Sequence, residues 1–345
     1  MRVLFVAIFA FAMLATAAKA QQWSDSDLGR VVVEGAADAR HLWLRGEHGV
    51  LVRFDRQTGE RTVLGRGFAD LLPDGGRLWT VSKAEGAREI IISDLRAPER
   101  PPIRFYPDGE PIGLFTSGSD RPGLLTTSHV LRPEPGRWRR WPLAAELQPY
   151  AHVAVGADGR LYVGYNRGEW GGGLRRVDPD VGSIVFVSET SDELCGGQIN
   201  PDCAPIVGVF PDPEQPACMI AGTSLAHMSS RKGQVLRICG DRITPVFADP
   251  LPPTPGGLNL PNQTWPFDSL VPTRDGWIAV SQDRYARSLS GSVEMQPTPP
   301  LKDWSGLRIS DERDGVLFVL AACCWGSGNP LTSHRLLAIP VEPAD

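Results

Sequence analysis

The sequence lacks two features that would point to a membrane or nucleic acid partner. No stretch reaches the roughly 20 consecutive apolar residues that a membrane-spanning helix needs. Basic residues never cluster in runs: 35 lysine and arginine residues stand against 40 acidic ones, and the formal net charge is −5. An acidic chain without a basic cluster is poorly suited to phosphate backbones. We therefore expect no integral membrane segment in the mature chain and no nucleic acid partner.

Recognisable catalytic and cofactor motifs are also missing. The chain has no G-x-S-x-G element, no P-loop and no dinucleotide fingerprint. Its cysteines lack the spacing of a zinc ribbon, and its six histidines are scattered. The sequence therefore predicts no cofactor, no metal and no catalytic residue that a motif identifies, and it leaves open whether the protein is an enzyme.

The first twenty residues differ from the rest. Arg2 is followed by the apolar run Val3–Met13, and Ala18-Lys19-Ala20 provides small residues around a cleavage point before Gln21. This pattern is typical of a cleavable signal peptide, and the alternative is a buried N-terminal helix. Arginine far outnumbers lysine, a composition common in GC-rich bacteria. We expect residues 1–20 to be removed and residues 21–345 to be periplasmic or secreted.

Short β-runs that follow tight turns recur along the chain. The clearest copy is Ala157–Val187, in which the turn Asp158-Gly159 precedes Leu161-Tyr162-Val163, and two further short runs follow. Seven such units begin at Arg40, Asp74, Arg121, Asp158, Gln215, Asp275 and Asp314. Most have one apolar run before them and one or two after them, so each unit predicts four short strands.

Four strands repeated seven times, at about 40 to 60 residues per copy, are the pattern of a β-propeller. The sequence therefore predicts an all-β fold in which residues 21–345 form one β-propeller domain, with seven blades of four antiparallel strands. Six or eight blades, a pair of two-sheet sandwiches and a β-helix are the alternatives. The last repeat has only three strands of its own. We expect the N-terminus, around Trp23–Leu28, to supply the fourth and close the ring.

The repeated turn–strand units resemble seven-bladed propellers of the broad group that includes two-component-regulator propellers and streptogramin-lyase-like proteins. The resemblance covers the mature chain at the level of architecture. The dipeptides that mark WD40 repeats are absent in register, and the catalytic histidines of the lyase have no counterpart here. The resemblance implies a fold but no particular chemistry, because propellers include enzymes, sensors and scaffolds.

In a propeller, the hairpins between second and third strands share one face with the crossovers between blades. Long, polar and aromatic loops fall on that face here, and such loops commonly bind ligands. In Tyr165–Gly173, three successive glycines allow close backbone approach, while Trp170 could stack on a ligand and Glu169 could accept its hydroxyls. The alternative is an exposed hairpin tip. The predicted ligand-binding residues are Asn166, Arg167, Glu169, Trp170, Arg284, Tyr285 and Trp325.

The leading functional hypothesis is binding of a small molecule or an envelope protein by a monomer through this loop-rich face. The alternative is a lyase or hydrolase that acts on a sugar or lactone at the channel mouth. In that case Glu169, with His129 or His227, would be the acid–base groups.

The six cysteines are an even number in a chain that we expect to be exported, which predicts disulfides. Cys218 and Cys239 fall in neighbouring strands of the fifth unit, so a hairpin would set them side by side. Cys195 and Cys203 would close a small loop in one crossover. Cys323 and Cys324 would then pair with each other or stay reduced.

Overall fold

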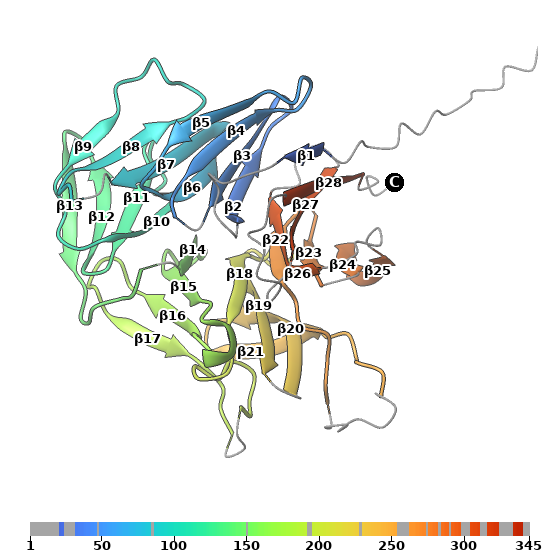
Figure 1. The fold of residues 1–345 in the computed structure, drawn as a ribbon. Helices are drawn as coiled ribbons and strands as arrows, with labels where there is room; N and C mark the ends of the chain where they lie inside the picture. The colour runs from blue at the N-terminus through green and yellow to red at the C-terminus, as the bar shows by residue number, and fades with distance from the viewer. Residues whose placement is uncertain are drawn as a thin grey trace, which may run out of the picture.

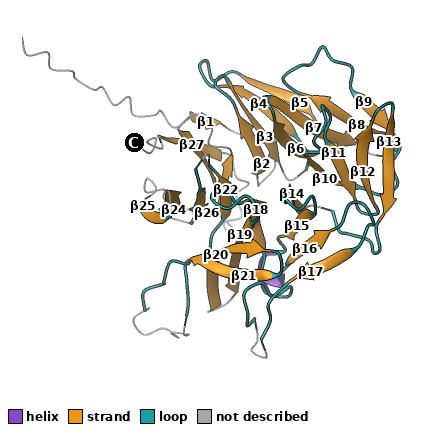
Figure 2. Ribbon diagram, turned by 180° about the vertical axis from the view of Figure 1, so that it is seen from behind, coloured by secondary structure: helices purple, strands orange, loops and turns teal. Residues whose placement is uncertain are grey.

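The computed structural model describes most of the chain between Gln21 and Pro340. The described ranges are 21–23, 32–46, 48–83, 86–149, 151–191, 195–227, 230–253, 262–273, 275–281, 284–289, 291–297, 304–310, 316–323 and 334–340. No helix within these ranges is long and apolar enough to cross a membrane. The one helical turn that they contain is the 3-10 helix η1 (Gly168–Trp170), which stands out in purple among strands and loops in Figure 2.

Across the described ranges, the strands pair into four-stranded antiparallel sheets that radiate from a central axis (Figure 1). Six sheets each take four consecutive strands. The first three sheets are β2 (Val32–Ala37), β3 (His41–Gly46), β4 (Leu51–Asp55) and β5 (Arg61–Gly65); β6 (Phe68–Asp74), β7 (Arg77–Lys83), β8 (Ile90–Asp94) and β9 (Ile103–Phe105); and β10 (Pro111–Phe115), β11 (Gly123–Thr126), β12 (His129–Glu134) and β13 (Arg137–Pro142).

The next three sheets continue the same order around the axis. They are β14 (Ala151–Val155), β15 (Leu161–Tyr165), β16 (Leu174–Val177) and β17 (Ile184–Val187); β18 (Ile206–Pro211), β19 (Met219–His227), β20 (Ser230–Cys239) and β21 (Arg242–Phe247); and β22 (Ser269–Pro272), β23 (Trp277–Val280), β24 (Arg284–Leu289) and β25 (Ser292–Pro297). In each sheet the first strand lies innermost, since residues of β2, β6, β10, β14, β18 and β22 line one central cavity.

A seventh sheet joins the two ends of the described chain. Its strands follow the order β1 (Gln21–Trp23), β28 (His334–Pro340), β27 (Val316–Cys323) and β26 (Trp304–Ser310). β1 pairs antiparallel with β28, with Gln21 opposite Leu336 and Trp23 opposite His334. The N-terminal segment therefore supplies the outer strand of the last sheet, which closes the ring without a covalent link. The predicted closure is confirmed, although the pairing strand begins two residues before the predicted segment.

These sheets make the protein an all-β propeller with blades of four antiparallel strands, as the sequence predicted. Every one of the repeated turn–strand units contributes the second strand of one sheet. Those second strands are β3, β7, β11, β15, β19, β23 and β27. Second strands are recognisable because they are buried on both sides: β15 and β23 carry only buried residues.

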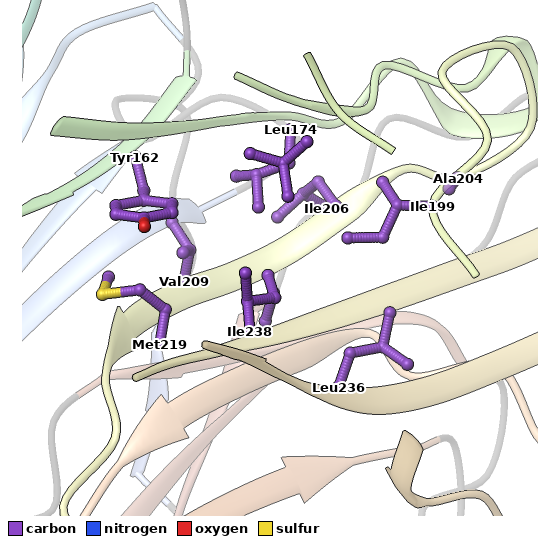
Figure 3. Packing of buried hydrophobic residues seen from close by; sticks show 11 residues of the cluster. Tyr162, Leu174, Ile199, Ala204, Ile206, Val209, Met219, Leu236 and Ile238 are labelled. Carbon is purple, nitrogen blue, oxygen red and sulfur yellow. The ribbon is translucent and has the colours of Figure 1, made fainter. Parts of the chain in front are cut away.

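The blades hold together through apolar side chains that interlock between neighbouring sheets. Between the fourth and fifth sheets, Tyr162 and Leu174 face Ile206, Met219 and the side chains around them (Figure 3). Tyr162 is almost fully buried, and burial raises the pKa of its hydroxyl. Burial of this many large side chains provides the main stabilising free energy of the ring.

Candidate functional site in the central cavity

A β-bulge recurs in the innermost strands of five blades: β26 shifts register between Trp304 and Leu307, and the other four bulges lie at one equivalent place. The register of β2, β6, β10 and β18 against their second strands shifts immediately before Glu34, Asp70, Gly113 and Gly208. A bulge bends its strand and re-aims the neighbouring side chains, and bulges are frequent beside functional sites. The four equivalent positions after the bulge hold two carboxylates and two glycines.

Both carboxylates reach across to the next blade. Glu34 Oε2 accepts a hydrogen bond of 3.0 Å from the backbone N–H of Leu71, and Asp70 Oδ2 accepts one from the backbone N–H of Leu114. Each donor comes directly after the bulge position of its own blade: Leu71 follows Asp70, and Leu114 follows Gly113. Two consecutive blade junctions are thus fastened by the same side-chain-to-backbone contact.

The two glycines let the next blade approach instead. A Cβ at Gly113 would lie 2.8 Å from Val153 Cγ2, and a Cβ at Gly208 would lie 2.2 Å from the carbonyl oxygen of Leu270. Neither distance is compatible with a side chain, so β14 and β22 pack directly against these glycines. The ring around the axis is therefore polar at its first two junctions and closely packed where Gly113 and Gly208 meet the next blade.

Arg45, at the end of β3, completes the polar side. Its Nε donates to Glu34 Oε2 over 2.8 Å, and its side chain is only 11% exposed. Burial, and then the neighbouring charge of Glu34, raise the pKa of Asp70 well above the usual range of an aspartic acid. Asp70 therefore keeps its proton at pH values where an ordinary aspartate has lost it, and it shares a hydrogen bond with Glu34.

These groups line a cavity of about 830 Å³ on the propeller axis. Among the described residues that line it, the side chains with a formal charge are Glu34, Arg45 and Asp70, and His152 adds a titratable ring. Most other lining residues are valine, leucine, alanine, phenylalanine and proline. A mostly apolar cavity with a few convergent polar groups is the usual form of a small-molecule site.

Of the predicted ligand-binding residues, Asn166 is the one described residue that also borders this cavity. Its Oδ1 accepts a hydrogen bond of 2.9 Å from the N–H of Gly168, which fixes the start of the hairpin loop. Arg167 donates to the side chain of Gln148. Trp170 lies in η1 with 72% of its surface exposed and is not among the residues that line the cavity. The structure therefore separates Trp170 from the cavity.

The remaining predicted residues give a mixed result. Arg284 lies 3.5 Å from the Asp249 carboxylate, and its guanidinium stacks 4.6 Å above the Trp265 ring, so its charge is already engaged by a crossover. Tyr285 is only 7% exposed, which leaves little of it for a ligand at the surface. The side chain of Glu169 and the whole of Trp325 lie outside the described residues.

The three consecutive glycines of the Tyr165–Gly173 loop contact another segment of the same chain. The N–H of Gly172 donates to the Pro201 carbonyl over 2.8 Å, and the N–H of Gly173 donates to the Ala204 carbonyl over 3.0 Å. A Cβ at Gly171 would lie 2.3 Å from the backbone of Asp202. The close approach that the sequence suggested for a ligand is made by the neighbouring crossover.

That crossover is held by one of two disulfides. Cys195 bonds to Cys203 within it, and Cys218 bonds to Cys239. Cys218 immediately precedes β19 and Cys239 ends β20, one position beyond the pair of Met219 and Ile238. Both predicted disulfides are confirmed. Cys323 ends β27, Cys324 lies outside the described residues, and the vicinal pair stays a prediction.

The histidines suggested as acid–base groups do not converge with the cavity in the part of the chain that is described. His129 Nδ1 lies 2.8 Å from the Ser128 hydroxyl, and His129 is not among the lining residues. The side chain of His227 lies outside the described residues. Across the described ranges, no three His, Cys, Asp or Glu side chains gather as a metal site would require.

The sequence analysis missed Glu34, Asp70 and His152. A signal for them exists: each is the one titratable residue in the interior of an otherwise apolar strand, in VVEGAA, FADLLPD and AHVAV. Such a residue is expensive to bury unless it has partners. Once an apolar strand is assigned to the innermost position, its lone polar residue is a candidate for the channel wall.

Comparisons with known proteins agree on the architecture. No protein-family model matches the chain, and no curated protein matches it significantly. Virginiamycin B lyase from Staphylococcus aureus is a similar solved structure, with 14% identity, a TM-score of 0.55, and coverage of 93% of this chain and 99% of that one. YCF48 bound to D1 peptide has 12% identity, a TM-score of 0.58, and coverage of 94% and 97%.

A third similar structure is the extracellular domain of a protein classed as a hybrid two component system from B. thetaiotaomicron. It shares 13% identity at a TM-score of 0.52, over 92% of this chain and 39% of that one. At these identities the likeness shows the fold alone. The chain is a β-propeller.

Proposed function

We propose that the protein is an exported β-propeller that binds a small ligand where the central cavity meets the loop-rich face. The observation that carries the proposal is the 830 Å³ cavity with its polar side at Glu34, Arg45 and Asp70. Asn166, which precedes η1 in a loop of that face, borders the same cavity. The cavity and the loop-rich face thus meet at one residue.

Export is supported by three independent features. The apolar run and small-residue site of residues 1–20 have the form of a signal peptide. β1 begins at Gln21, the residue after the predicted cleavage point, so cleavage would leave the closing strand whole. The two disulfides match an oxidising compartment. Mass spectrometry of the protein isolated from a bacterial periplasm should find Gln21 as the first residue, and an intact Met1 would contradict export.

Binding at the cavity mouth is tested by a thermal-shift screen of residues 21–345 with small envelope sugars, lactones and amines. A ligand that binds only the folded state raises the unfolding midpoint. Loss of the shift in Asn166→Ala, with retention in Trp170→Ala, would locate the site at the cavity. The reverse pattern would place the site at the exposed Trp170, outside the cavity, and favour a protein partner. A flat screen would contradict small-ligand binding.

One observation supports the second candidate function, a lyase or hydrolase. Asp70 holds its proton beside Glu34 in a mostly apolar cavity, the arrangement that suits a general acid. Turnover of a sugar or lactone that appears in the screen, abolished by Asp70→Asn while the protein stays folded, would favour the enzyme. Binding without turnover would favour the binding protein.

A further inference from the structure

We propose that the cavity binds an organic ammonium ion, whose apolar body packs against the fourth to sixth blades and whose ammonium group lies between the carboxyl groups of Glu34 and Asp70. This inference rests on the proposed function and names its ligand class. It starts from the division of the cavity into two unlike walls.

The polar wall belongs to the first two blades and carries Glu34, Arg45 and Asp70. The opposite wall is formed by β14, β18 and β22 and presents side chains such as Val155, Phe210 and Val271. A volume of about 830 Å³ lies within the range of small-molecule sites. The ligand that fits both walls has one polar end and an apolar body.

The charges on the polar wall decide the sign of that polar end. Arg45 and Glu34 neutralise each other over 2.8 Å, and Asp70 stays neutral by keeping its proton. When Asp70 ionises, two carboxylates face one guanidinium in a poorly solvated space. An ammonium group supplies the missing positive charge and three hydrogen-bond donors.

The groups around Asp70 leave the supply of this positive charge to a ligand. β2 and β3 contribute Glu34 and Arg45, whereas β10 contributes Gly113 and the Leu114 N–H, which carry no charge. His152, on β14, is the further titratable group on the described cavity wall. An anionic ligand would have to lie against Glu34, and Arg45 Nε already donates to that carboxylate. A neutral alcohol carries no positive charge that could replace the proton.

Binding by exchange has a measurable proton balance. In the free site Arg45 Nε contacts the Glu34 carboxylate over 2.8 Å and Asp70 keeps its proton. The bound site holds the ammonium ion and two carboxylates, so one proton leaves to solvent. The apparent affinity for the amine should therefore rise by up to about tenfold for each pH unit, as long as Asp70 is protonated in the free protein.

The test is isothermal titration calorimetry on residues 21–345 with 4-phenylbutylamine at pH 7, in phosphate and in Tris buffer. The neutral analogue 4-phenylbutanol and the anion 4-phenylbutyrate are the comparison ligands. We expect the amine to bind at least tenfold more tightly than either, with a buffer-dependent enthalpy that corresponds to about one released proton.

The matched variants are Asp70→Asn, which mimics the protonated acid, and Trp170→Ala, at an exposed residue outside the cavity. Asp70→Asn should lose the proton release and at least tenfold in amine affinity, while thermal unfolding confirms that it is folded. Trp170→Ala should bind like the parent. Equal affinity for the alcohol, or amine binding without proton release, would overturn the inference.

Two failures have different meanings. If the amine fails but another ligand depends on Asn166, the ammonium inference is wrong and binding at the cavity mouth stands. If every ligand fails in both the titration and the thermal-shift screen, both proposals are wrong.

Discussion

Asp70 of the second blade accepts a hydrogen bond from the backbone N–H of Leu114 in the third. The carboxyl group that makes this contact is half-buried in the cavity beside Glu34, and desolvation together with the Glu34 charge raises its pKa well above the ordinary value. A protonated acid keeps one oxygen as an acceptor for Leu114 and turns the other into a donor for Glu34. The blade junction is thus fastened by a neutral acid.

Asp70→Asn should stabilise the protein, and more so as the pH rises. Between the unfolded pKa of about 3.9 and the raised folded pKa, the native state binds more protons than the unfolded state, so wild-type stability falls with rising pH. Asparagine keeps the donor and the acceptor without titrating. We expect a midpoint gain at pH 7 that shrinks toward pH 4, measured by thermal unfolding.

The comparison for that experiment is Asp70→Ala. Alanine removes the titration but also leaves the Leu114 N–H without its partner, which costs about 1–3 kcal/mol. It should therefore be less stable than Asp70→Asn at every pH. An Asp70→Asn protein whose stability relative to wild type does not change between pH 4 and pH 7 would show that the pKa of Asp70 is unshifted.

Gly171→Ala should destabilise the protein by at least ~2 kcal/mol. Its φ is 77°, and a Cβ would lie 2.3 Å from the backbone of Asp202. Gly168→Ala is the matched control, because its φ is 61° but its Cβ would meet nothing within 4 Å. The control should lose only about 1 kcal/mol, the cost of a left-handed backbone in a residue other than glycine. Equal losses in chemical denaturation would mean that the crossover does not press on this loop.

The sequence predicted the blades better than it predicted the site. Second strands such as Leu161–Tyr165 are buried on both sides and follow Asp-Gly turns, so composition and turn chemistry suffice to find them. The innermost strands are equally short and apolar, and only the closed ring reveals which side faces the axis. Glu34 and Asp70 therefore cannot be assigned to the channel wall from the sequence, whereas the equivalent bulges in their strands place them there.

For the glycine-rich loop, the sequence predicts the backbone conformation but not the segment that contacts it. Its three consecutive glycines allow close backbone approach, and that inference was sound. Sequence cannot say what approaches, because the partner Pro201–Ala204 lies about thirty residues later and is brought there by the Cys195–Cys203 crossover. Local patterns predict a conformation, whereas the contact depends on the packing of neighbouring blades.

The two disulfides should stabilise the fold by similar amounts. Their cysteines are 8 and 21 residues apart, and loop-closure entropy predicts about 2.5 and about 3.3 kcal/mol. Only the shorter bridge lies beside the glycine loop. Cys195→Ala with Cys203→Ala should therefore increase amide hydrogen exchange in 165–173, whereas Cys218→Ala with Cys239→Ala should leave that loop protected. Identical exchange in both double variants would contradict this coupling.

Removal of residues 21–23 should weaken the whole ring, since β1 pairs with β28 and is the outer strand of the last sheet. A protein that begins at Ser24 leaves an unpaired edge on β28, which favours intermolecular strand pairing. We expect a loss of about 1–3 kcal/mol and a midpoint lower by several degrees.

Replacement of Gln21, Gln22 and Trp23 by three alanines is the control for that truncation. The backbone can still pair with β28, so the triple-alanine protein should unfold at a midpoint between those of the parent and the truncated chain. Sedimentation should detect association in the truncated protein alone. A truncated chain as stable as the parent would show that the ring does not need the N-terminal strand. An alanine variant as unstable as the truncation would assign the stabilisation to the side chains and not to the strand pairing.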